Sequence, residues 1–565
     1  MSHIFSDKEI VKIIADIAVK NNLKRVVFSP GSRNAPLSIT FARDERIETF
    51  VLVDERSAAF FALGMAQQCG NPVGLVCTSG TALLNYAPAI AEAYYQRIPL
   101  VVISADRPLE WIDQDDSQAI RQQEALKGVV KGVYQLPVAV ENADDRWYAN
   151  RLVNDAFNTA LSGRKGPVHI NVPLREPLYG LKSYAENKER IVRMINSTDD
   201  LSDDVVADLS KTISSSSKIM VLAGLSAPSA DLQRALEWFS SLPQAVVLAE
   251  TVSNLSSPEF ITTIDRVVIS FSETELPDFM PDLLISFGGP VVSKIIRRMI
   301  RSCPPSRHWY VGDGEPLIDT FCRLTERIDV SPSVFFNRMI PVSKPVQSSN
   351  YAAIWDMRNK EQAEKHDAFL QTAEWSDLQA FGIILSSIPQ GSNLQLGNSA
   401  TVRYAQLFND CKASDMRANR GTSGIDGSSS TAAGASCVFD GLTTLISGDM
   451  SLMYDSHAFW NPYLTSRFKV IVMKNGGGGI FRFISGPSDV EECEQYFETA
   501  QDIDVERLAA FYRLKYFKVS DAESLRNTLP LFYEANERPA ILEVETPRTV
   551  NDRVLKAYFK SLQNR

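Results

Sequence analysis

A chain of 565 residues is too long to fold around one hydrophobic core, so its length suggests two to four domains. Hydrophobic residues make up 44% and charged residues 22%, as in ordinary globular proteins, and no stretch approaches the roughly 20 unbroken apolar residues of a membrane helix. The formal charge of −10 argues against a nucleic-acid partner, so any anionic ligand must be met by locally clustered Arg or Lys.

Residues 1–25 have the pattern of an amphipathic helix rather than of a signal peptide, and we expect a cytoplasmic protein without membrane insertion. Seven cysteines are scattered along the chain with no CxxC pair, which favours buried free thiols over disulfides or zinc. Five dispersed histidines and the lack of a GxSxG motif argue against a transition-metal site and against a Ser-His-Asp triad.

Apolar, strand-like runs that end in Gly, Ser or Asp loops and lead into helical patterns recur along the chain. Such runs are typical of parallel strands covered by helices on both faces. A polar stretch near 180–204 and a linker-like segment at 341–350 divide them into three sets. In chain order the runs are 25–33, 73–81, 100–108 and 168–173; then 218–227, 245–250, 283–290 and 309–313; then 394–400, 442–451, 468–477 and 539–547.

This pattern predicts an α/β fold with three doubly wound parallel-sheet domains. We expect a first domain at 1–185, a middle domain at 186–345 and a C-terminal domain at 346–565. In such sheets ligands bind beyond the carboxyl ends of the strands, where the loops cluster. Candidate functional residues should therefore lie in those loops.

Two consecutive strand ends in the third domain carry oxygen ligands. One strand ends on GDMS, which contains Asp449, and the next ends on KNGGGG, which contains Asn475 and Gly477. A right-handed crossover brings both ends to the same sheet edge, so Asp449 and Asn475 should face one another. With the Gly477 carbonyl they form an oxygen site suited to Mg²⁺, or to Mn²⁺, and the glycines let a diphosphate approach the main chain.

Two other interpretations of these glycines stay open at this point. One is a glycine-rich surface turn next to a solvated aspartate. The other is the GxGxxG loop of a dinucleotide-binding fold, although the acidic residue expected about 20 positions later is missing.

The Gly-Asp pair at Asp449 followed by Asn475 is similar to the diphosphate motif of thiamine-diphosphate enzymes, which opens on Gly-Asp-Gly and closes on Asn-Asn. Met450 and Lys474 depart from that motif. Because side chains alternate along a strand, Lys474 would point away from the metal and could vary without removing a ligand. The resemblance also implies that Ser451 contacts the cofactor.

In thiamine-diphosphate enzymes a glutamate bonds the aminopyrimidine ring, which then removes the thiazolium C2 proton. Glu55 follows an apolar strand and precedes a helix of small and aromatic residues, and it matches this position. Burial near Phe60 and Phe61 would let its carboxyl group share a proton with a ring nitrogen. The alternative is that Asp54 and Glu55 only favour the N-terminus of the helix through its dipole.

Longer motifs in the first and third domains narrow the resemblance. They are SPGSRNAPLS (29–38), DERSAAFFALG (54–64), CTSGTALLNYAPAIAEAYY (77–95), SADRP (104–108), QAIRQ (118–122), GNSATVR (397–403), NRGTSGIDGSSSTAAG (419–434) and GGGGIF (476–481). Together they resemble the 2-succinyl-5-enolpyruvyl-6-hydroxy-3-cyclohexene-1-carboxylate synthases of menaquinone biosynthesis. Generic thiamine enzymes lack the arginine-bearing loops.

The resemblance implies a carboligase that decarboxylates 2-oxoglutarate and adds the succinyl carbanion to isochorismate. Both substrates carry two carboxylates, which arginine forks bind bidentately. By resemblance, the residues that meet the oxoacid are Ser399, Arg403 and Arg420. Those that meet isochorismate are Ser32, Arg33, Arg107, Gln118 and Lys294.

The middle domain departs from the family pattern, because Ile295 stands where a basic residue would follow Lys294. Arg297 or Arg298 would compensate from one helical turn further on. Ile425 matches the bulky apolar residue that props the cofactor into its bent form. The alternative for Ile425 is simple loop packing.

In the family that the chain resembles, the pyrimidine and diphosphate loops come from different subunits. This implies a homo-oligomer, either a dimer or a tetramer. A related 2-oxoacid decarboxylase or acetolactate synthase would keep Glu55 and Asp449 without needing four arginines for carboxylates. A catalytically idle cofactor-binding module would not need Glu55.

Overall fold

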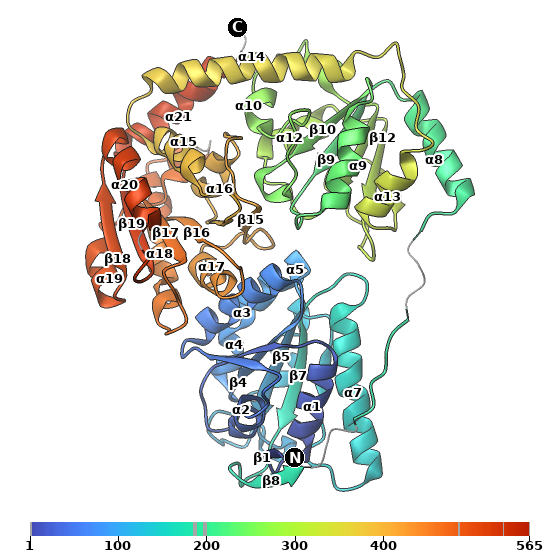
Figure 1. Ribbon diagram of the computed structural model, residues 1–565, viewed down its shortest axis with the longest axis vertical. Helices are drawn as coiled ribbons and strands as arrows, with labels where there is room; N and C mark the ends of the chain where they lie inside the picture. Colours follow the sequence, from blue (N-terminus) through green and yellow to red (C-terminus); the bar gives the residue numbers. More distant parts are fainter. Residues whose placement is uncertain (1–2, 185–188, 196–199, 484–485, 535, 564–565) are drawn as a thin grey trace.

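The computed structural model describes residues 3–563 apart from 185–188, 196–199, 484–485 and 535. Parallel sheets of six, five and six strands, each flanked by helices, form three lobes (Figure 1). The α/β fold of three doubly wound sheets predicted from the sequence is therefore confirmed. The predicted boundary between residues 185 and 186 lies outside the described residues. No helix in the described part of the chain is long and apolar enough to cross a membrane.

The N-terminal sheet is parallel throughout and has the strand order β3-β2-β4-β5-β7-β6. Strands β4, β5 and β7 are buried along their whole length, as expected of a sheet covered on both faces. Its strands are β2 (Arg25–Phe28), β3 (Glu48–Val51), β4 (Val73–Cys77), β5 (Leu100–Asp106), β6 (Val133–Gln135) and β7 (Val168–Pro173). Its helices are α1 (Glu9–Lys20), α2 (Ala35–Ala42), α3 (Glu55–Cys69), α4 (Thr81–Asn85), α5 (Ala87–Gln96), α6 (Gln122–Ala125) and α7 (Ala143–Leu161). An antiparallel pair, β1 (His3–Ser6) with β8 (Leu181–Tyr184), joins the two ends of this lobe.

The middle sheet is also parallel, with the order β10-β9-β11-β12-β13. Its strands are β9 (Ile219–Ala223), β10 (Ala245–Ala249), β11 (Leu283–Phe287), β12 (Arg307–Val311) and β13 (Leu324–Ile328). The helices around it are α8 (Asp203–Ser215), α9 (Ala230–Ser240), α10 (Ile264–Val268), α11 (Leu276–Phe279), α12 (Lys294–Ser302) and α13 (Pro332–Met339).

The C-terminal sheet has the order β15-β14-β16-β17-β19-β18 and is parallel. Strands β16 and β17 are direct neighbours, so the crossover expected between them is present. The strands are β14 (Asn393–Leu396), β15 (Asp415–Ala418), β16 (Thr443–Gly448), β17 (Phe468–Lys474), β18 (Lys515–Val519) and β19 (Ala540–Glu545). The helices are α15 (Asp377–Ser387), α16 (Ala400–Ala405), α17 (Ser428–Ser436), α18 (Asp449–Tyr454), α19 (Val505–Phe511), α20 (Ala522–Glu534) and α21 (Arg548–Leu562).

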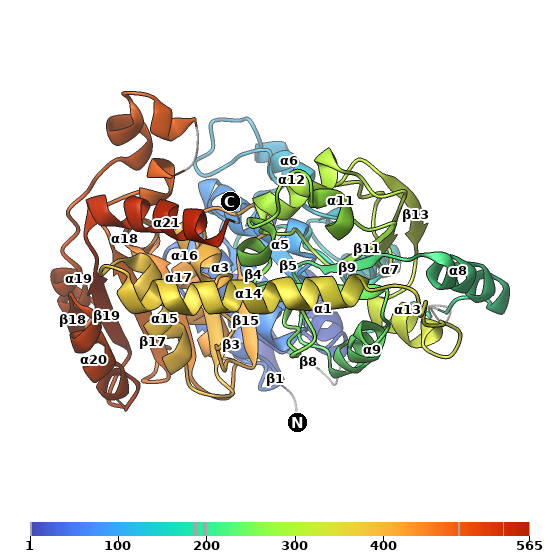
Figure 2. The ribbon, with the colours of Figure 1, turned by 90° about the horizontal axis from the view of Figure 1, so that it is seen from above.

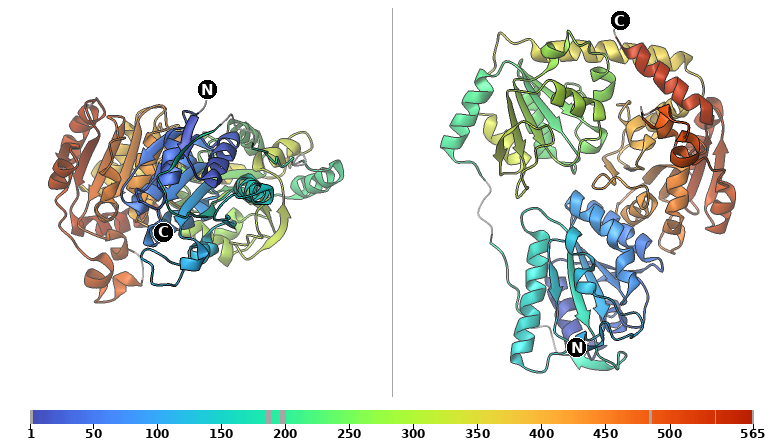
Figure 3. Two further views of the ribbon diagram at one scale, coloured as in Figure 1. Left: turned by 90° about the horizontal axis from the view of Figure 1, so that it is seen from below. Right: turned by 180° about the vertical axis from the view of Figure 1, so that it is seen from behind.

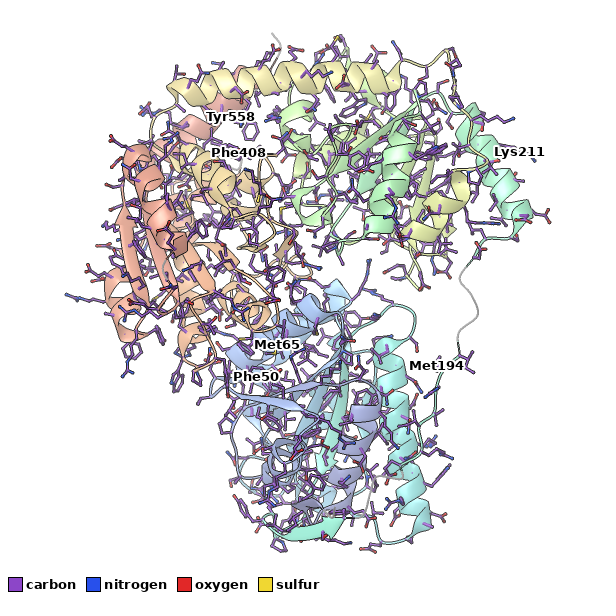
Figure 4. The ribbon with its side chains drawn as sticks, in the orientation of Figure 1. Phe50, Met65, Met194, Lys211, Phe408 and Tyr558 are labelled. Atoms are coloured by element: carbon purple, nitrogen blue, oxygen red, sulfur yellow. The ribbon has the colours of Figure 1, made fainter. Side chains whose placement is uncertain are left out.

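A long helix, α14 (Tyr351–Thr372), spans the middle and C-terminal lobes (Figure 2). Its first half packs on the middle lobe through the buried rings of Tyr351 and Trp355. In its second half, His366 Nδ1 lies 2.7 Å from the hydroxyl of Tyr558 on α21. Phe408 and Tyr558 both lie below this helix (Figure 4). The helix therefore fixes the two lobes against each other.

The N-terminal and C-terminal lobes share one hydrophobic core, although they are far apart in the sequence. Helix α3 packs against α17 at the junction seen in Figure 3. Buried side chains such as Phe61 on α3 and Leu445 on β16 belong to the same cluster. This contact places the N-terminus of α3 beside the loops of the C-terminal lobe.

The seven cysteines are free, but the expectation that they are buried is wrong for most of them. Cys77 is buried in β4, whereas Cys322 is exposed and the other five are partly exposed. Their apolar sequence surroundings did not distinguish a strand centre from the rim of a lobe.

Candidate active site

Asp449 lies at the carboxyl end of β16 and begins α18. It is 2% exposed, and its carboxylate accepts hydrogen bonds from the backbone N–H groups of Gly476, at 2.8 Å, and Met450, at 2.7 Å. Burial raises the pKa of Asp449 to about 6, although these two hydrogen bonds offset part of the rise. No Lys or Arg of the described residues lies within ion-pair distance of this carboxylate. A buried carboxylate without a cation is the environment that a bound metal ion would balance.

Asn475 follows β17 and points to the opposite side from Lys474. Its Nδ2 donates to Asp377 Oδ2 at 2.8 Å. Lys474 Nζ instead lies 3.4 Å from carboxylate oxygens of both Asp502 and Glu543. The expected alternation along the strand is therefore observed, and Lys474 is held away from Asp449.

The glycine loop after β17 has a backbone that other residues adopt with difficulty. Gly476 and Gly477 have φ values of +80° and +142°. A Cβ at Gly477 would lie 2.9 Å from the carbonyl oxygen of Glu498, and Gly478 N–H donates to that same oxygen at 2.8 Å. The first group to approach this backbone is thus the segment around Glu498 in the same chain, whose carboxylate is paired with Arg482 and Arg548.

A cavity of about 190 Å³ opens between these loops. Ser451 Oγ donates to the Ile425 carbonyl at 2.8 Å, which ties two of its walls together. Ser399 also lines the cavity, and its φ of 69° is an unusual backbone conformation for a serine. Six of the residues predicted from the sequence line the cavity: Ser399, Ile425, Asp449, Ser451, Asn475 and Gly477.

These residues fit a metal-bound diphosphate. The Asp449 carboxylate has no cation, and the Asn475 amide has its NH₂ end engaged so that Oδ1 remains as an acceptor. The Gly477 carbonyl accepts the Gly479 N–H at 2.8 Å, which leaves a second lone pair. A carboxylate, an amide oxygen and a carbonyl are ligands that Mg²⁺ and Mn²⁺ bind.

Glu55 begins α3 in the N-terminal lobe and is half-buried. Burial is the main cause that raises its pKa, and the charge of Asp54 adds to the shift. Asp54, rather than Glu55, caps the helix, because its carboxylate accepts the Ser57 N–H at 3.0 Å and also lies 2.5 Å from His457 Nδ1. Glu55 is not among the described residues that line the cavity around Asp449.

A group of cations lies where the middle lobe meets the C-terminal lobe. Arg420 is 7% exposed, and burial together with the charge of Arg403 lowers its pKa to about 10. Burial also lowers the pKa of Arg403. Burial is the main cause that lowers the pKa of Lys294, and the charges of Arg403, Arg297 and Arg420 lower it further. In the described part of the chain none of these four cations has a carboxylate within ion-pair distance.

This cation cluster, Lys294, Arg297, Arg403 and Arg420, adjoins the cavity around Asp449. A second cavity of about 150 Å³ is lined by Lys294 and Arg403, and it shares Ala400 with the first. Two carboxylates lie next to the cluster. The buried Glu250 accepts the backbone N–H groups of Val292 and Ser293, each at 2.7 Å, and the partly exposed Asp265 accepts the Ser293 hydroxyl. Cations that have no carboxylate partner and line or adjoin a cavity suit a ligand with several carboxylates.

The remaining predicted residues stay together on the N-terminal lobe, at the ends of β2, β4 and β5. Arg33 donates to the Leu174 carbonyl at 3.0 Å, and Arg107 pairs with Asp116 at 2.8 Å. The backbone of Gln118 packs against Gly80, and Gln118 itself has a φ of 57°. Ser32 is exposed beside Arg33. Within the described residues no hydrogen bond or ion pair joins this group to the cation cluster.

Three buried carboxylates near the site were not predicted from the sequence. Asp377 stands at the start of α15, where an acidic residue is ordinary, so no sequence pattern marked it. Glu92 accepts hydrogen bonds from the loop after Arg420, and a glutamate inside the apolar run PAIAEAYY was a signal that could have been used. Glu250 follows an apolar strand in the same way as Glu55 and could have been found by that rule.

Comparison with known proteins identifies the N-terminal lobe. Residues 8–126 match the family model described as thiamine pyrophosphate enzyme, N-terminal TPP binding domain. The matched lobe carries Glu55, and the match places the chain in the class of thiamine-pyrophosphate-dependent enzymes.

Full-length relatives define the family within this class. The chain is 44% identical to the 2-succinyl-5-enolpyruvyl-6-hydroxy-3-cyclohexene-1-carboxylate synthase of Porphyromonas gingivalis, over 98% of this chain and 97% of the relative. It is 40% and 41% identical to the synthases of the same name from Flavobacterium johnsoniae and Flavobacterium psychrophilum, over 97% of this chain and 98% of each relative. The chain belongs to the 2-succinyl-5-enolpyruvyl-6-hydroxy-3-cyclohexene-1-carboxylate synthase family.

Proposed function

We propose that the protein decarboxylates 2-oxoglutarate and transfers the remaining succinyl unit to isochorismate, in the pathway to menaquinone. Both substrates follow from the family to which the chain belongs. The observation that carries the proposal is the unpaired cation cluster beside the Asp449 cavity, because positive charge concentrated in an otherwise acidic protein suits a substrate with two carboxylates.

Asp449, Asn475 and the Gly477 carbonyl would hold Mg²⁺, with Mn²⁺ as a possible substitute, and through it the diphosphate of the cofactor. When bound, thiamine diphosphate supplies a carbon centre that accepts the electrons released on loss of CO₂. Ser451 and Ile425 would complete the wall against which the cofactor rests. The carboxyl group of Glu55 would hold a proton and share it with a ring nitrogen of the cofactor, a role that its raised pKa supports.

The proposed substrate-binding residues come from all three lobes. Ser399, Arg403 and Arg420 would bind the oxoacid next to the cofactor. Isochorismate would be met by Ser32, Arg33, Arg107, Gln118 and Lys294. We also propose domain boundaries at 1–185, 186–345 and 346–565, so that each lobe contributes one part of the site.

The active site is proposed to form between two subunits. Glu55 does not line the cavity of its own chain, which supports a site that receives Glu55 from a partner. Large apolar side chains beside the N-terminus of α3 are exposed, and such patches typically mark an interface. They are Val51, Val53, Met453, Tyr454 and Trp460.

Catalysis tests the reaction. Protein supplied with Mg²⁺, thiamine diphosphate, 2-oxoglutarate and isochorismate should release CO₂, and Glu55→Gln should lower this rate by about 10²–10⁴-fold. Glu45→Gln, an exposed glutamate on the same lobe, is the matched control and should keep full activity. If the wild-type protein releases no more CO₂ than the Glu55 variant, the proposal is wrong. Greater activity with pyruvate than with 2-oxoglutarate would favour an acetolactate-synthase-like enzyme instead.

A mixing experiment tests the shared site. Glu55→Gln and Asp449→Asn should each be inactive alone. After the two variants are unfolded and refolded together, half of the dimers are hybrids, and one of their two sites is intact, so about a quarter of the wild-type activity should return. A site formed within one chain would recover none, and sedimentation of an active monomer would also contradict the shared site.

A further inference from the structure

One buried carboxylate on the wall of the Asp449 cavity has no part in the function proposed above. Asp377, the first residue of α15, is 3% exposed and lines this cavity. Its Oδ2 accepts the Asn475 Nδ2–H at 2.8 Å, and its Oδ1 accepts the Thr546 hydroxyl at 2.6 Å. No Lys or Arg of the described residues lies within ion-pair distance, so only neutral groups bond this carboxylate.

Asp377 is itself held rigidly. Asn551 Oδ1 on α21 accepts the backbone N–H of Asp377 at 2.8 Å, and Asn551 Nδ2 donates to Thr546 Oγ1 at 3.1 Å. The carboxylate is thus fixed between the start of α15, the end of β19 and the first turns of α21. A group anchored from three elements can impose an orientation on a neighbour.

The hydrogen bond between Asp377 and Asn475 fixes which end of the Asn475 amide, NH₂ or carbonyl, faces Asp377. An amide has a donor end and an acceptor end of nearly equal size, whereas an ionised carboxylate can only accept. Asp377 can therefore bond only the NH₂ end of Asn475. The carbonyl end, Oδ1, is left as the acceptor on the side of the cavity, and a negative charge behind the NH₂ group increases the electron density on Oδ1.

We propose that Asp377 is a positioning residue for the metal site, which orients Asn475 so that Oδ1 is presented to the metal ion. The proposal rests on the proposed function, because it takes Asn475 as a metal ligand. Partners that orient metal ligands from behind typically change metal affinity by 10–100-fold when they are removed. Asp377 also brings a second buried negative charge to a site that already holds Asp449, and a divalent cation balances the two.

The test is a titration of Mg²⁺ into the full-length protein in the presence of saturating thiamine diphosphate. Calorimetry and tryptophan fluorescence measure the binding. Asp377→Asn should weaken Mg²⁺ binding by about 10–100-fold. The matched control is Asp455→Asn. Asp455 is also a fully buried carboxylate bonded by neutral donors, the N–H and hydroxyl of Ser430, each at 2.6 Å, but it does not contact a proposed metal ligand. Its variant should bind Mg²⁺ within about threefold of wild type.

A second variant separates positioning from folding. Exchange of the two groups, Asp377→Asn together with Asn475→Asp, keeps the charge and the hydrogen bond, with the amide at 377 now donating to the carboxylate at 475. This double variant should bind Mg²⁺ more tightly than Asp377→Asn alone. Melting curves without metal identify a variant that has lost its fold, and in that case the double variant decides.

Three results would overturn the inference or its premise. If Asp377→Asn weakens Mg²⁺ binding no more than Asp455→Asn, or if the exchanged pair binds no better than Asp377→Asn, Asp377 does not position Asn475. If the wild-type protein itself shows no Mg²⁺-dependent binding of thiamine diphosphate, the proposed function fails and the inference fails with it. The first two results leave the proposed function intact.

Discussion

Helices α3 and α17 cross with a glycine on each side, and this crossing yields a quantitative prediction. A Cβ at Gly434 would lie 1.9 Å from the carbonyl oxygen of Phe61, and a Cβ at Gly64 would lie 1.9 Å from that of Thr431. Ordinary contact begins at 3.4 Å, so Gly434→Ala requires a separation of about 1.5 Å (3.4 − 1.9) between two backbones. Because the obstacle is a main-chain atom, no change of side-chain rotamer relieves the clash.

Two opposing effects decide the size of the change. Replacing a glycine inside a helix by alanine gains about 1 kcal/mol from helix propensity. Overpacking a well-packed contact costs roughly 1–3 kcal/mol, and a backbone clash belongs at the upper end. We therefore expect Gly434→Ala to lower the free energy of unfolding by about 1–2 kcal/mol. For a unit of 150–250 residues this lowers the melting temperature by roughly 2–8 °C.

Thermal unfolding followed by circular dichroism measures the effect. Gly128→Ala is the control, because a Cβ there meets no atom within 4 Å, and its melting temperature should stay near that of wild type. Since α3 begins with Glu55, the Gly434 variant should also lose activity at temperatures where it remains folded. A Gly434→Ala protein that melts at or above the wild-type temperature would refute the close crossing of the two helices.

Further predictions concern the substrate site. Glu92→Gln removes a carboxylate that holds the loop after Arg420 through three hydrogen bonds of 2.6 Å, and it should raise KM for 2-oxoglutarate about tenfold with little change in kcat; an unchanged KM would contradict this role. Arg297→Met should raise the same KM about tenfold, whereas Arg298→Met, a change at an exposed neighbour, should leave it unchanged. Equal effects of the two changes would show that Arg297 does not act with the cation cluster. Burial raises the pKa of Glu250 from 4.5 to about 7, so the folded protein keeps a proton that the unfolded chain releases, and this contribution to stability is lost as the pH rises from 4.5 to 7. In denaturant unfolding, the stability of wild type relative to Glu250→Gln should therefore fall between pH 4.5 and 7, and parallel pH profiles would contradict the shift.

The strands that match the twelve apolar runs are buried along most of their length. Each of the twelve apolar runs overlaps a strand of the three sheets. The strands that sequence reasoning missed include β6, β13, β15 and β18, all of which lie at sheet edges. The residues of these strands are mixed, as in the partly exposed LTERI of β13, so the apolar signal is absent. The edge strand β10 was predicted because its residues, AVVLA, are apolar and all buried.

The sequence by itself determined which residues follow which strands, and so placed Asp449 beside Asn475, because consecutive parallel strands joined by a right-handed crossover must end at the same edge. It also marked Glu55 and the arginine loops through motifs of the chain. Only the tertiary structure decided that cations from two lobes lie beside one cavity, that Asp377 accepts a hydrogen bond from the Asn475 amide, and that Glu55 does not line that cavity in its own chain. These facts depend on how separate domains pack, and packing is set by the fit of surfaces distant in the sequence, which local pattern and propensity do not encode.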